Sequence, residues 1–193
     1  MQKSHNSRII IRQGTRILLP SQYQELRKEL PLNYQILCDA ALYTGMRMVE
    51  FWALLDHPEW YHPSQRIIDL PKEGSAKKGN VEERSIRLTP AGARALDLLF
   101  QVEPDFRERD AMRGALRRAA ERAGLGTKGI MPKMFRKWLA SYLVECRKDL
   151  GIDTLEICAN MGHDEKTLRK HYYGVFLPAD HPEIYEFVRG FNQ

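Results

Sequence analysis

A glycine–histidine pair is followed, nine residues after the histidine, by a tyrosine in the stretch Met161-Gly162-His163-Asp164-Glu165-Lys166-Thr167-Leu168-Arg169-Lys170-His171-Tyr172-Tyr173-Gly174. Glycine commonly ends helices, because it adopts the left-handed backbone without steric cost. The pattern predicts a helix over 155–161 that ends at Gly162, with Asp153 and Glu156 as its capping box. A short helix over 164–173 is then expected to lead to the two tyrosines.

The chain before this stretch is predicted to be mainly helical with one small antiparallel sheet, an α+β class. Ser21 is expected to cap the first helix and Pro31 to stop it. Residues 56–66 form a turn-rich loop, and 67–70 and 85–88 are the expected strands of a hairpin. Further helices are expected over 33–44, 47–55, 91–101, 110–123, 133–149 and 182–191.

Composition indicates a single domain of ordinary size, at 193 residues and 22.5 kDa with 43% hydrophobic residues. No apolar run approaches the roughly 18 residues that a membrane helix needs, and no signal peptide is evident. A cytoplasmic protein without membrane association is expected, in the host cytoplasm if the gene is viral or plasmid-borne. The three cysteines have neither metal nor disulfide spacing, so no metal site is predicted.

Basic residues suggest a polyanionic partner, since the formal net charge is +5. Arginines are concentrated between 107 and 122, and a second basic segment runs from 128 to 148. Arg113, Arg117 and Lys137 are the residues of these segments predicted to face a DNA backbone.

Three further blocks supply cations that phosphodiester chemistry without a metal requires. Thr44-Gly45-Met46-Arg47 places an arginine at a helix break, and Lys133-Met134-Phe135-Arg136 places two cations on one helical turn. A planar guanidinium binds two phosphate oxygens at once, and a tyrosine can attack phosphorus and hold the phosphate covalently. A lysine on the hairpin connection can protonate the leaving oxygen.

These blocks, in this order, resemble the catalytic domain of the tyrosine recombinase (phage-type integrase) family. The resemblance covers residues 44–173 and rests on Thr44–Arg47 with Glu50, on Lys78-Gly79-Asn80 before the second strand, on Lys133–Arg136, and on Gly162-His163 with Tyr172. Lys133 stands where the family usually has a histidine. A cation at this position also resembles some archaeal viral integrases.

The resemblance implies cleavage and rejoining of DNA strands through a 3′-phosphotyrosyl intermediate, without metal, ATP or another cofactor. Arg47 and Arg136 would clamp the scissile phosphate, Lys133 and His163 would assist, and Glu50 would orient Arg47. Tyr172 would attack; the family's less common ten-residue spacing would instead select Tyr173. Lys78 would be the general acid, with Lys77 as its alternative and Lys72 as a weaker third choice.

The family also implies double-stranded DNA as partner, a tetramer assembled on a DNA site, and a monomer in solution. Two other functions stay open: a type IB topoisomerase, which shares this catalytic constellation, and a catalytically weak DNA-binding module of the same fold. Residues 1–193 are expected to form one catalytic domain with a tail over 174–193, and without the amino-terminal core-binding domain that family members usually carry.

Overall fold

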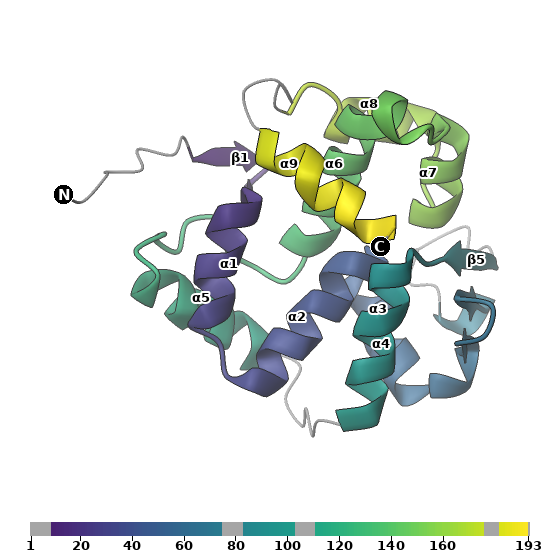
Figure 1. Cartoon of the computed structure of the whole chain (residues 1–193), viewed down its shortest axis with the longest axis horizontal. Coiled ribbons are helices and arrows are strands. Elements are labelled where there is room, and N and C mark those ends of the chain that lie inside the picture. Colours follow the sequence, from purple (N-terminus) through teal and green to yellow (C-terminus); the bar gives the residue numbers. More distant parts are fainter. Residues whose placement is uncertain (1–8, 75–82, 103–110, 176–181, 193) are drawn as a thin grey trace.

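The computed structural model describes residues 9–74, 83–102, 111–175 and 182–192, and these are mainly helical with two small antiparallel sheets (Figure 1). This confirms the predicted fold class, although two sheets are present where one was expected. The helices are α1 (Pro20–Lys28), α2 (Leu32–Thr44), α3 (Met48–Asp56), α4 (Pro90–Val102), α5 (Ala111–Arg122), α6 (Met134–Leu150), α7 (Thr154–Met161), α8 (Glu165–Tyr172) and α9 (Pro182–Arg189). Short 3-10 turns cover η1 (Pro58–Trp60), η2 (Lys72–Gly74) and η4 (Gly190–Asn192).

Helix α6 is the centre of the fold, with α2, α7, α8, α9 and the second strand packed around it. Its side chains Phe135, Trp138 and Tyr142 are fully buried. Tyr23 of α1 meets the Trp138 ring edge-on at 5.0 Å between centroids. A helix that is apolar on most sides must be enclosed by other elements, and this places both ends of α6 beside segments that are distant in sequence.

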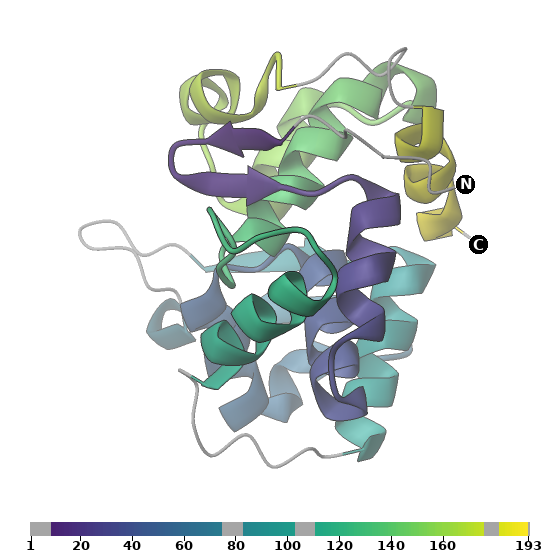
Figure 2. The ribbon, with the colours of Figure 1, turned by 90° about the vertical axis from the view of Figure 1, so that its left-hand side faces the viewer.

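The first sheet is a hairpin of β1 (Ile10–Arg12) and β2 (Thr15–Ile17), joined by a two-residue turn. All three residues of β2 are buried, and the strand packs on α6. The Arg16 amide donates to the Gly129 carbonyl at 3.0 Å. A Cβ on Gly129 would lie 2.8 Å from the Arg16 amide nitrogen, so this close approach requires glycine. Figure 2 shows the hairpin beside α8.

The second sheet has the order β3 (Tyr61–His62), β4 (Ile67–Leu70) and β5 (Arg84–Arg87), with both pairings antiparallel. Ile68 pairs with Ile86, and both are buried against the core. The hairpin predicted from β4 and β5 is therefore present. Lys77 and Lys78, the candidate general acids on its connection, lie outside the described residues.

Three local predictions differ from the structure. The first helix begins at Pro20, not Ser21, with Leu19 as N-cap; the Leu19 amide donates to the Gln22 side chain at 3.1 Å. Proline suits the first helical position because its ring presets φ and no amide hydrogen is needed there. Asp153 occupies the N-cap position of α7 but makes no side-chain cap bond.

The third difference lies in the turn-rich stretch, which contains β3. A strand of two residues has no periodicity that a sequence pattern can detect. By contrast, Thr89 accepts the Gly92 amide at 3.2 Å and so begins α4 at Pro90 as predicted.

The tail helix α9 packs on its own domain, against α6 and α1. Ile184 and Val188 are buried, and the Phe187 ring lies parallel to Trp138 at 5.8 Å and stacks on Tyr43 at 6.0 Å. Among the described residues, no helix is long and apolar enough to cross a bilayer.

Candidate active site

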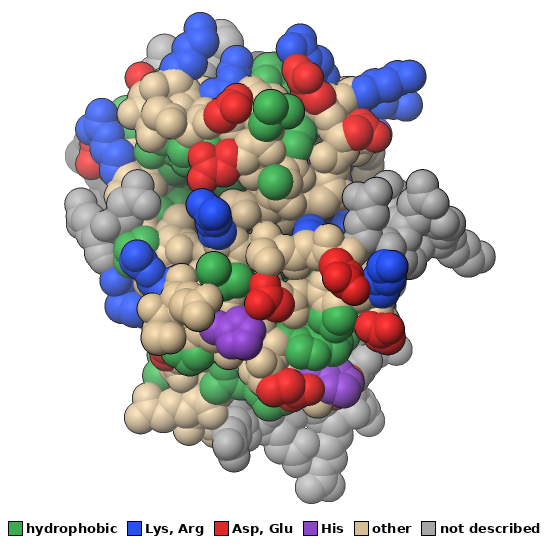
Figure 3. Space-filling view, turned by 90° about the vertical axis from the view of Figure 1, so that its right-hand side faces the viewer, with side chains coloured by type: hydrophobic (Ala, Val, Ile, Leu, Met, Phe, Trp, Pro, Cys, Tyr) green, Lys and Arg blue, Asp and Glu red, His purple; other side chains and the backbone are tan. Residues whose placement is uncertain are grey.

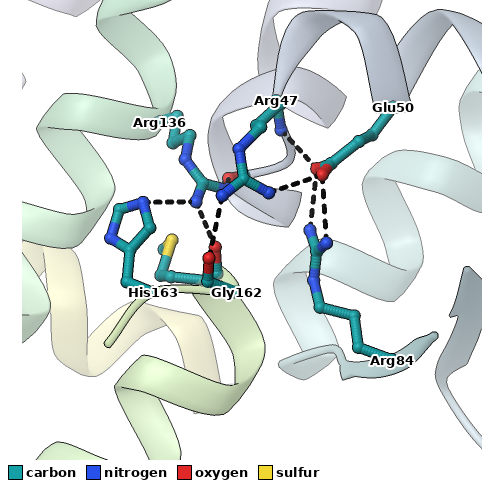
Figure 4. Close-up of polar contacts among 8 residues, drawn as sticks. Arg47, Glu50, Arg84, Arg136, Gly162 and His163 are labelled. Atoms are coloured by element: carbon teal, nitrogen blue, oxygen red, sulfur yellow. Dashed lines mark hydrogen bonds and ion pairs between the residues drawn. The ribbon is translucent and has the colours of Figure 1, made fainter. Parts of the chain in front are cut away.

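Two arginines from distant helices lie against the carboxyl ends of two others. The Arg136 guanidinium on α6 donates to the carbonyl of Gly45, which ends α2, at 2.8 Å, and also to the carbonyl of Met161 at the end of α7. Arg47 at the start of α3 donates to the Gly162 carbonyl at 2.8 Å (Figure 4). Unpaired carbonyls and the negative end of the helix dipole favour cations at these positions. The helix ends therefore fix both guanidinium groups in place.

Glycines make this approach possible. Gly45 has φ +61, and a Cβ there would lie 2.7 Å from Leu139. Gly162 has φ +57, and a Cβ there would lie 3.1 Å from the Arg84 guanidinium. Both positions need the left-handed backbone that glycine adopts freely. The two glycines quoted in the sequence motifs thus end helices and leave room for side chains of the cluster.

Glu50 on α3 is the carboxylate of this cluster and is 0% exposed. It accepts from the Arg47 guanidinium at 2.6 Å and from the Arg47 amide at 2.9 Å. Arg84 on β5 donates to both of its oxygens, at 3.0 and 2.7 Å. Burial raises the pKa of Glu50, but the hydrogen bonds and charges of Arg84 and Arg47 lower it overall. Glu50 is therefore an anion that orients two arginines.

Arg84 is the member of the cluster that sequence reasoning did not assign to the site. It lies in the second strand of the hairpin, where a charged residue normally faces solvent. One signal pointed to it: Glu50 lies in an apolar helix, and a buried carboxylate needs cationic partners. Local sequence pattern did not distinguish Arg84 from an ordinary surface arginine.

His163 follows Gly162 and accepts a hydrogen bond at Nε2 from Arg136 at 2.7 Å. Burial, and then the positive charges of Arg136, Arg47 and Arg84, lower the pKa of His163 to about 3. The imidazole is therefore neutral near pH 7, and because Nε2 accepts, its proton is on Nδ1. Nδ1 is buried and has no hydrogen-bond partner among the described residues. The Nδ1–H lies on the side of the ring away from Arg136 (Figure 4), so His163 contacts the cluster through Nε2.

Tyr172 is the last residue of α8 and is 8% exposed. Its ring lies nearly parallel to the His163 imidazole, at 5.2 Å and 19°. Burial raises the pKa of Tyr172, and the charge and hydrogen bond of Arg136, together with the charge of Arg47, oppose that rise. The phenol thus lies beside the guanidinium groups that a phosphate would also contact.

Tyr173 lies just beyond the helix, with an extended backbone at φ −74 and ψ 146. Its ring faces a different set of side chains: the Arg147 guanidinium lies 4.8 Å from the ring centroid and that of Arg169 5.9 Å. Because the helix ends between them, the two adjacent tyrosines lie in different surroundings.

The remaining predicted residues lie on α5 and in the first turn of α6. Lys133 is exposed at the N-cap of α6, one turn before Arg136. Arg113 and Arg117 are exposed on α5. Lys137 is 8% exposed, and its ammonium group donates to the Arg12 carbonyl at 2.8 Å and to the Gln13 side chain at 3.0 Å. Contacts of these residues with DNA stay predictions.

The face at the right of Figure 1 has interspersed acidic and basic side chains, with histidines among the acidic ones in its lower half (Figure 3). His62 on β3 pairs with Asp69 on β4 at 3.2 Å, and His57 at the end of α3 pairs with Glu59 on η1 at 3.0 Å. No set of three or more His, Cys, Asp or Glu residues suited to a metal occurs in the described part of the chain. A mixed surface of this kind does not favour a nucleic acid over other partners.

Comparison with solved structures gives matches at low sequence identity. A structure described as XerA recombinase matches with a TM-score of 0.60 and 17% identity, covering 90% of this chain and 65% of that one. XerH site-specific recombinase bound to difH substrate, in a pre-cleavage complex, matches with a TM-score of 0.56 and 17% identity over 80% of this chain and 50% of that one. Its post-cleavage complex with palindromic difH matches with a TM-score of 0.58 and 15% identity over 98% and 55%.

The matched chains are longer than this one, which spans 50% to 65% of their length. Neither the protein-family models nor the curated protein sequences give a match. The likeness is thus one of structure over most of this chain, and it agrees with the resemblance seen in the sequence blocks. The chain has the fold of the tyrosine recombinase catalytic domain.

Proposed function

We propose that this protein cleaves and rejoins duplex DNA as a site-specific tyrosine recombinase, with Tyr172 as the nucleophile. The observation that carries the proposal is the convergence of Arg47, Arg136, His163 and Tyr172 at the ends of α2, α6, α7 and α8. Guanidinium groups, a neutral imidazole and a phenol in one place suit the attack of a tyrosine on a phosphodiester.

The chemistry follows from the arrangement. The Tyr172 oxygen forms a bond to phosphorus and gives its proton to solvent, while the bond from phosphorus to the 5′ oxygen breaks. Arg47 and Arg136 neutralise the non-bridging oxygens, and Nε2 of the neutral His163 accepts from Arg136 and so helps to hold that guanidinium in place. Lys78, or Lys77 beside it, protonates the departing 5′ oxygen. The 3′-phosphotyrosyl bond retains the energy needed for rejoining, so the reverse attack requires no ATP.

The choice of Tyr172 over Tyr173 is supported by its neighbours. Tyr172 stacks on His163 and lies within the influence of Arg136, whereas Tyr173 faces Arg147 and Arg169. Arg136 stays protonated at neutral pH, because burial and the charge of Arg47 lower its pKa only to about 10. The candidate phosphate site therefore keeps its positive charge over the physiological range.

Duplex DNA is the proposed partner, supported by the exposed Arg113, Arg117 and Lys133 and by the difH substrate that is bound in the XerH structures. We propose a tetramer on DNA, as site-specific strand exchange requires. A DNA-binding module with weak catalysis is the second candidate, and the feature that favours it is the buried Tyr172, whose pKa is raised.

The test is covalent capture. Wild type, Tyr172→Phe and Tyr173→Phe are incubated with nicked suicide duplexes of randomised sequence, and SDS-resistant adducts are isolated and sequenced. The proposal expects adducts with wild type and Tyr173→Phe and none with Tyr172→Phe. Adduct loss only in Tyr173→Phe would transfer the nucleophile to that residue. Absence of any adduct from a protein that still binds the duplexes would favour the binding module.

A further inference from the structure

The turn of the β1–β2 hairpin has an unusual residue for its backbone. Strand register pairs Arg12 with Thr15, so Gln13 and Gly14 form a two-residue loop, and their φ values are 50 and 70. Positive φ at both positions marks the turn type that favours Asn-Gly, Asp-Gly or Gly-Gly. A glutamine here opposes the local preference, because a longer side chain gains nothing from the left-handed backbone. The reason for its presence is therefore found in its contacts.

The Gln13 side chain lies between α6 and α8. Its Oε1 accepts from the Lys137 ammonium at 3.0 Å, and its Nε2 contacts Nδ1 of His171. Lysine only donates, so the oxygen of the amide must face Lys137 and the NH2 group must face His171. It follows that Nδ1 of His171 is an acceptor. A side chain shorter by one methylene would not reach both partners.

Arg12 holds the same two helices from the adjacent position. Its carbonyl accepts from Lys137 at 2.8 Å, and its guanidinium donates to the Tyr173 carbonyl at 3.3 Å. His171 and Tyr173 are the residues on either side of Tyr172. The turn thus contacts both chain neighbours of the proposed nucleophile.

The contacts of Gln13 and Arg12 thus tether α8 to α6, the helix that carries Arg136. Lys137 is the next residue along α6, and burial, followed by the charges of Lys133 and Arg12, lowers its pKa. The hairpin itself is fixed to the domain by the buried strand β2 and by the bond from Arg16 to Gly129. The turn therefore connects α6, at the residue next to Arg136, to the short helix α8. The outer face of α8 is exposed.

We propose that Gln13 is a positioning residue, which holds α8 so that the Tyr172 oxygen lies in reach of a phosphate clamped by Arg47 and Arg136. The catalytic part of this inference rests on the proposed function, whereas the tether between hairpin and α8 does not. Reacting groups misplaced by about 1 Å lose on the order of a hundredfold in rate. Contacts that fix one helix end relative to another therefore affect the reaction rate even when they lie at the surface.

Two substitutions remove the contacts of the Gln13 side chain, and leave the turn and the Arg12 contacts intact. Gln13→Gly and Gln13→Asn both suit a left-handed backbone, and neither side chain spans Lys137 and His171. Gln13→Glu keeps the length and the bond to Lys137 but has no donor for Nδ1 of His171. Gln24→Ala is the matched control, since Gln24 is an exposed glutamine on α1.

Hydrogen exchange of the segment 164–175 in the intact free protein measures the tether directly. Gln13→Gly and Gln13→Asn are expected to raise the exchange rate about fivefold, the factor that the loss of one net hydrogen bond produces. Gln24→Ala should leave it unchanged, and melting temperatures of the Gly and Asn variants should equal or exceed that of wild type. Unchanged exchange in both variants would overturn the inference, whether or not the protein cleaves DNA.

Adduct formation on nicked duplexes measures the consequence. All three Gln13 variants are expected to form adducts about tenfold or more slowly than wild type at saturating duplex, with duplex affinity unchanged. Equal rates in wild type and Gln13→Gly would overturn the positioning role. No adduct in wild type itself would refute the proposed function, and with it the role of Gln13 in catalysis, while the exchange result would still decide the tether.

Discussion

Replacing Glu50 by glutamine tests whether one buried carboxylate organises the arginine cluster. The substitution preserves shape and removes the charge from a site that is 0% exposed. It also replaces an acceptor oxygen by an NH2 group facing guanidinium donors that now lie 2.6 to 3.0 Å from Glu50. At least one Arg84 or Arg47 donor is then left without an acceptor, and the two cations lose the anion between them.

Removing one partner of a buried ion pair costs about 3 to 5 kcal/mol. Because glutamine retains one acceptor, we expect the lower end, about 3 kcal/mol in the free energy of unfolding. For a chain of this size, that loss corresponds to about 6 to 12 °C in melting temperature. Urea denaturation followed by circular dichroism measures it. Glu165→Gln is the control, because Glu165 pairs with Arg169 at the surface and should cost under about 1 kcal/mol.

The same variant changes the pH dependence of stability. The folded-state pKa of Glu50 is lowered, so the carboxylate stabilises the native state above its unfolded pKa of about 4.3, and this contribution is lost as pH falls. Wild type should therefore lose more stability than Glu50→Gln between neutral pH and acid. If Glu50→Gln unfolds within about 0.5 kcal/mol of wild type and has the same pH profile, the carboxylate does not organise the cluster.

Two other predictions concern the remaining members of the site. The Lys78→Ala variant should not cleave an ordinary duplex. It should still cleave a duplex with a 5′-bridging sulfur, because a thiolate leaves without a proton from an acid. Lys77→Ala should cleave both substrates, and the opposite pattern would assign the acid to Lys77. His163 should show no imidazole titration by NMR between pH 8 and pH 5, since its pKa is about 3. The unfolded chain takes up that proton near pH 6.5, so His163 makes the free energy of unfolding fall as pH decreases below that value. The His163→Gln variant should lack this part of the pH dependence. An NMR titration midpoint of His163 near neutral pH would contradict the buried site.

Much of the fold was predictable from local pattern. Gly45, Gly151 and Gly162 end helices with left-handed backbones, and Thr89-Pro90 begins one. Such signals depend on φ angles and caps that a few neighbouring residues determine. The predictions that were wrong, at Ser21, at Asp153 and in the loop containing β3, concern a competing cap, a missing cap bond and a strand too short to show alternation. Each is a choice between local options of similar energy.

The sequence predicted which candidate residues lie together better than it predicted their contacts. The order of the sequence blocks identified Arg47, Arg136, His163 and Tyr172 as candidates, and these residues lie together in the structure. Arg84 and Gln13 were not assigned, because their partners Glu50, Lys137 and His171 are separated from them by 34 residues or more. No local pattern records such a pairing.

Local patterns in the sequence are enough to predict where helices end, to identify candidate residues for phosphodiester chemistry, and to place a tyrosine nine or ten residues beyond a histidine. The environment of each group depends instead on how the helices pack. The carboxyl ends of α2 and α7 meet, so that the carbonyls of Gly45, Met161 and Gly162 hold two guanidinium groups. The resulting burial and positive charge make His163 neutral. Because α8 ends between the two tyrosines, one ring lies on that histidine and the other beneath surface arginines. Electrostatics and burial act through space, and for that reason the packing of the elements decides them.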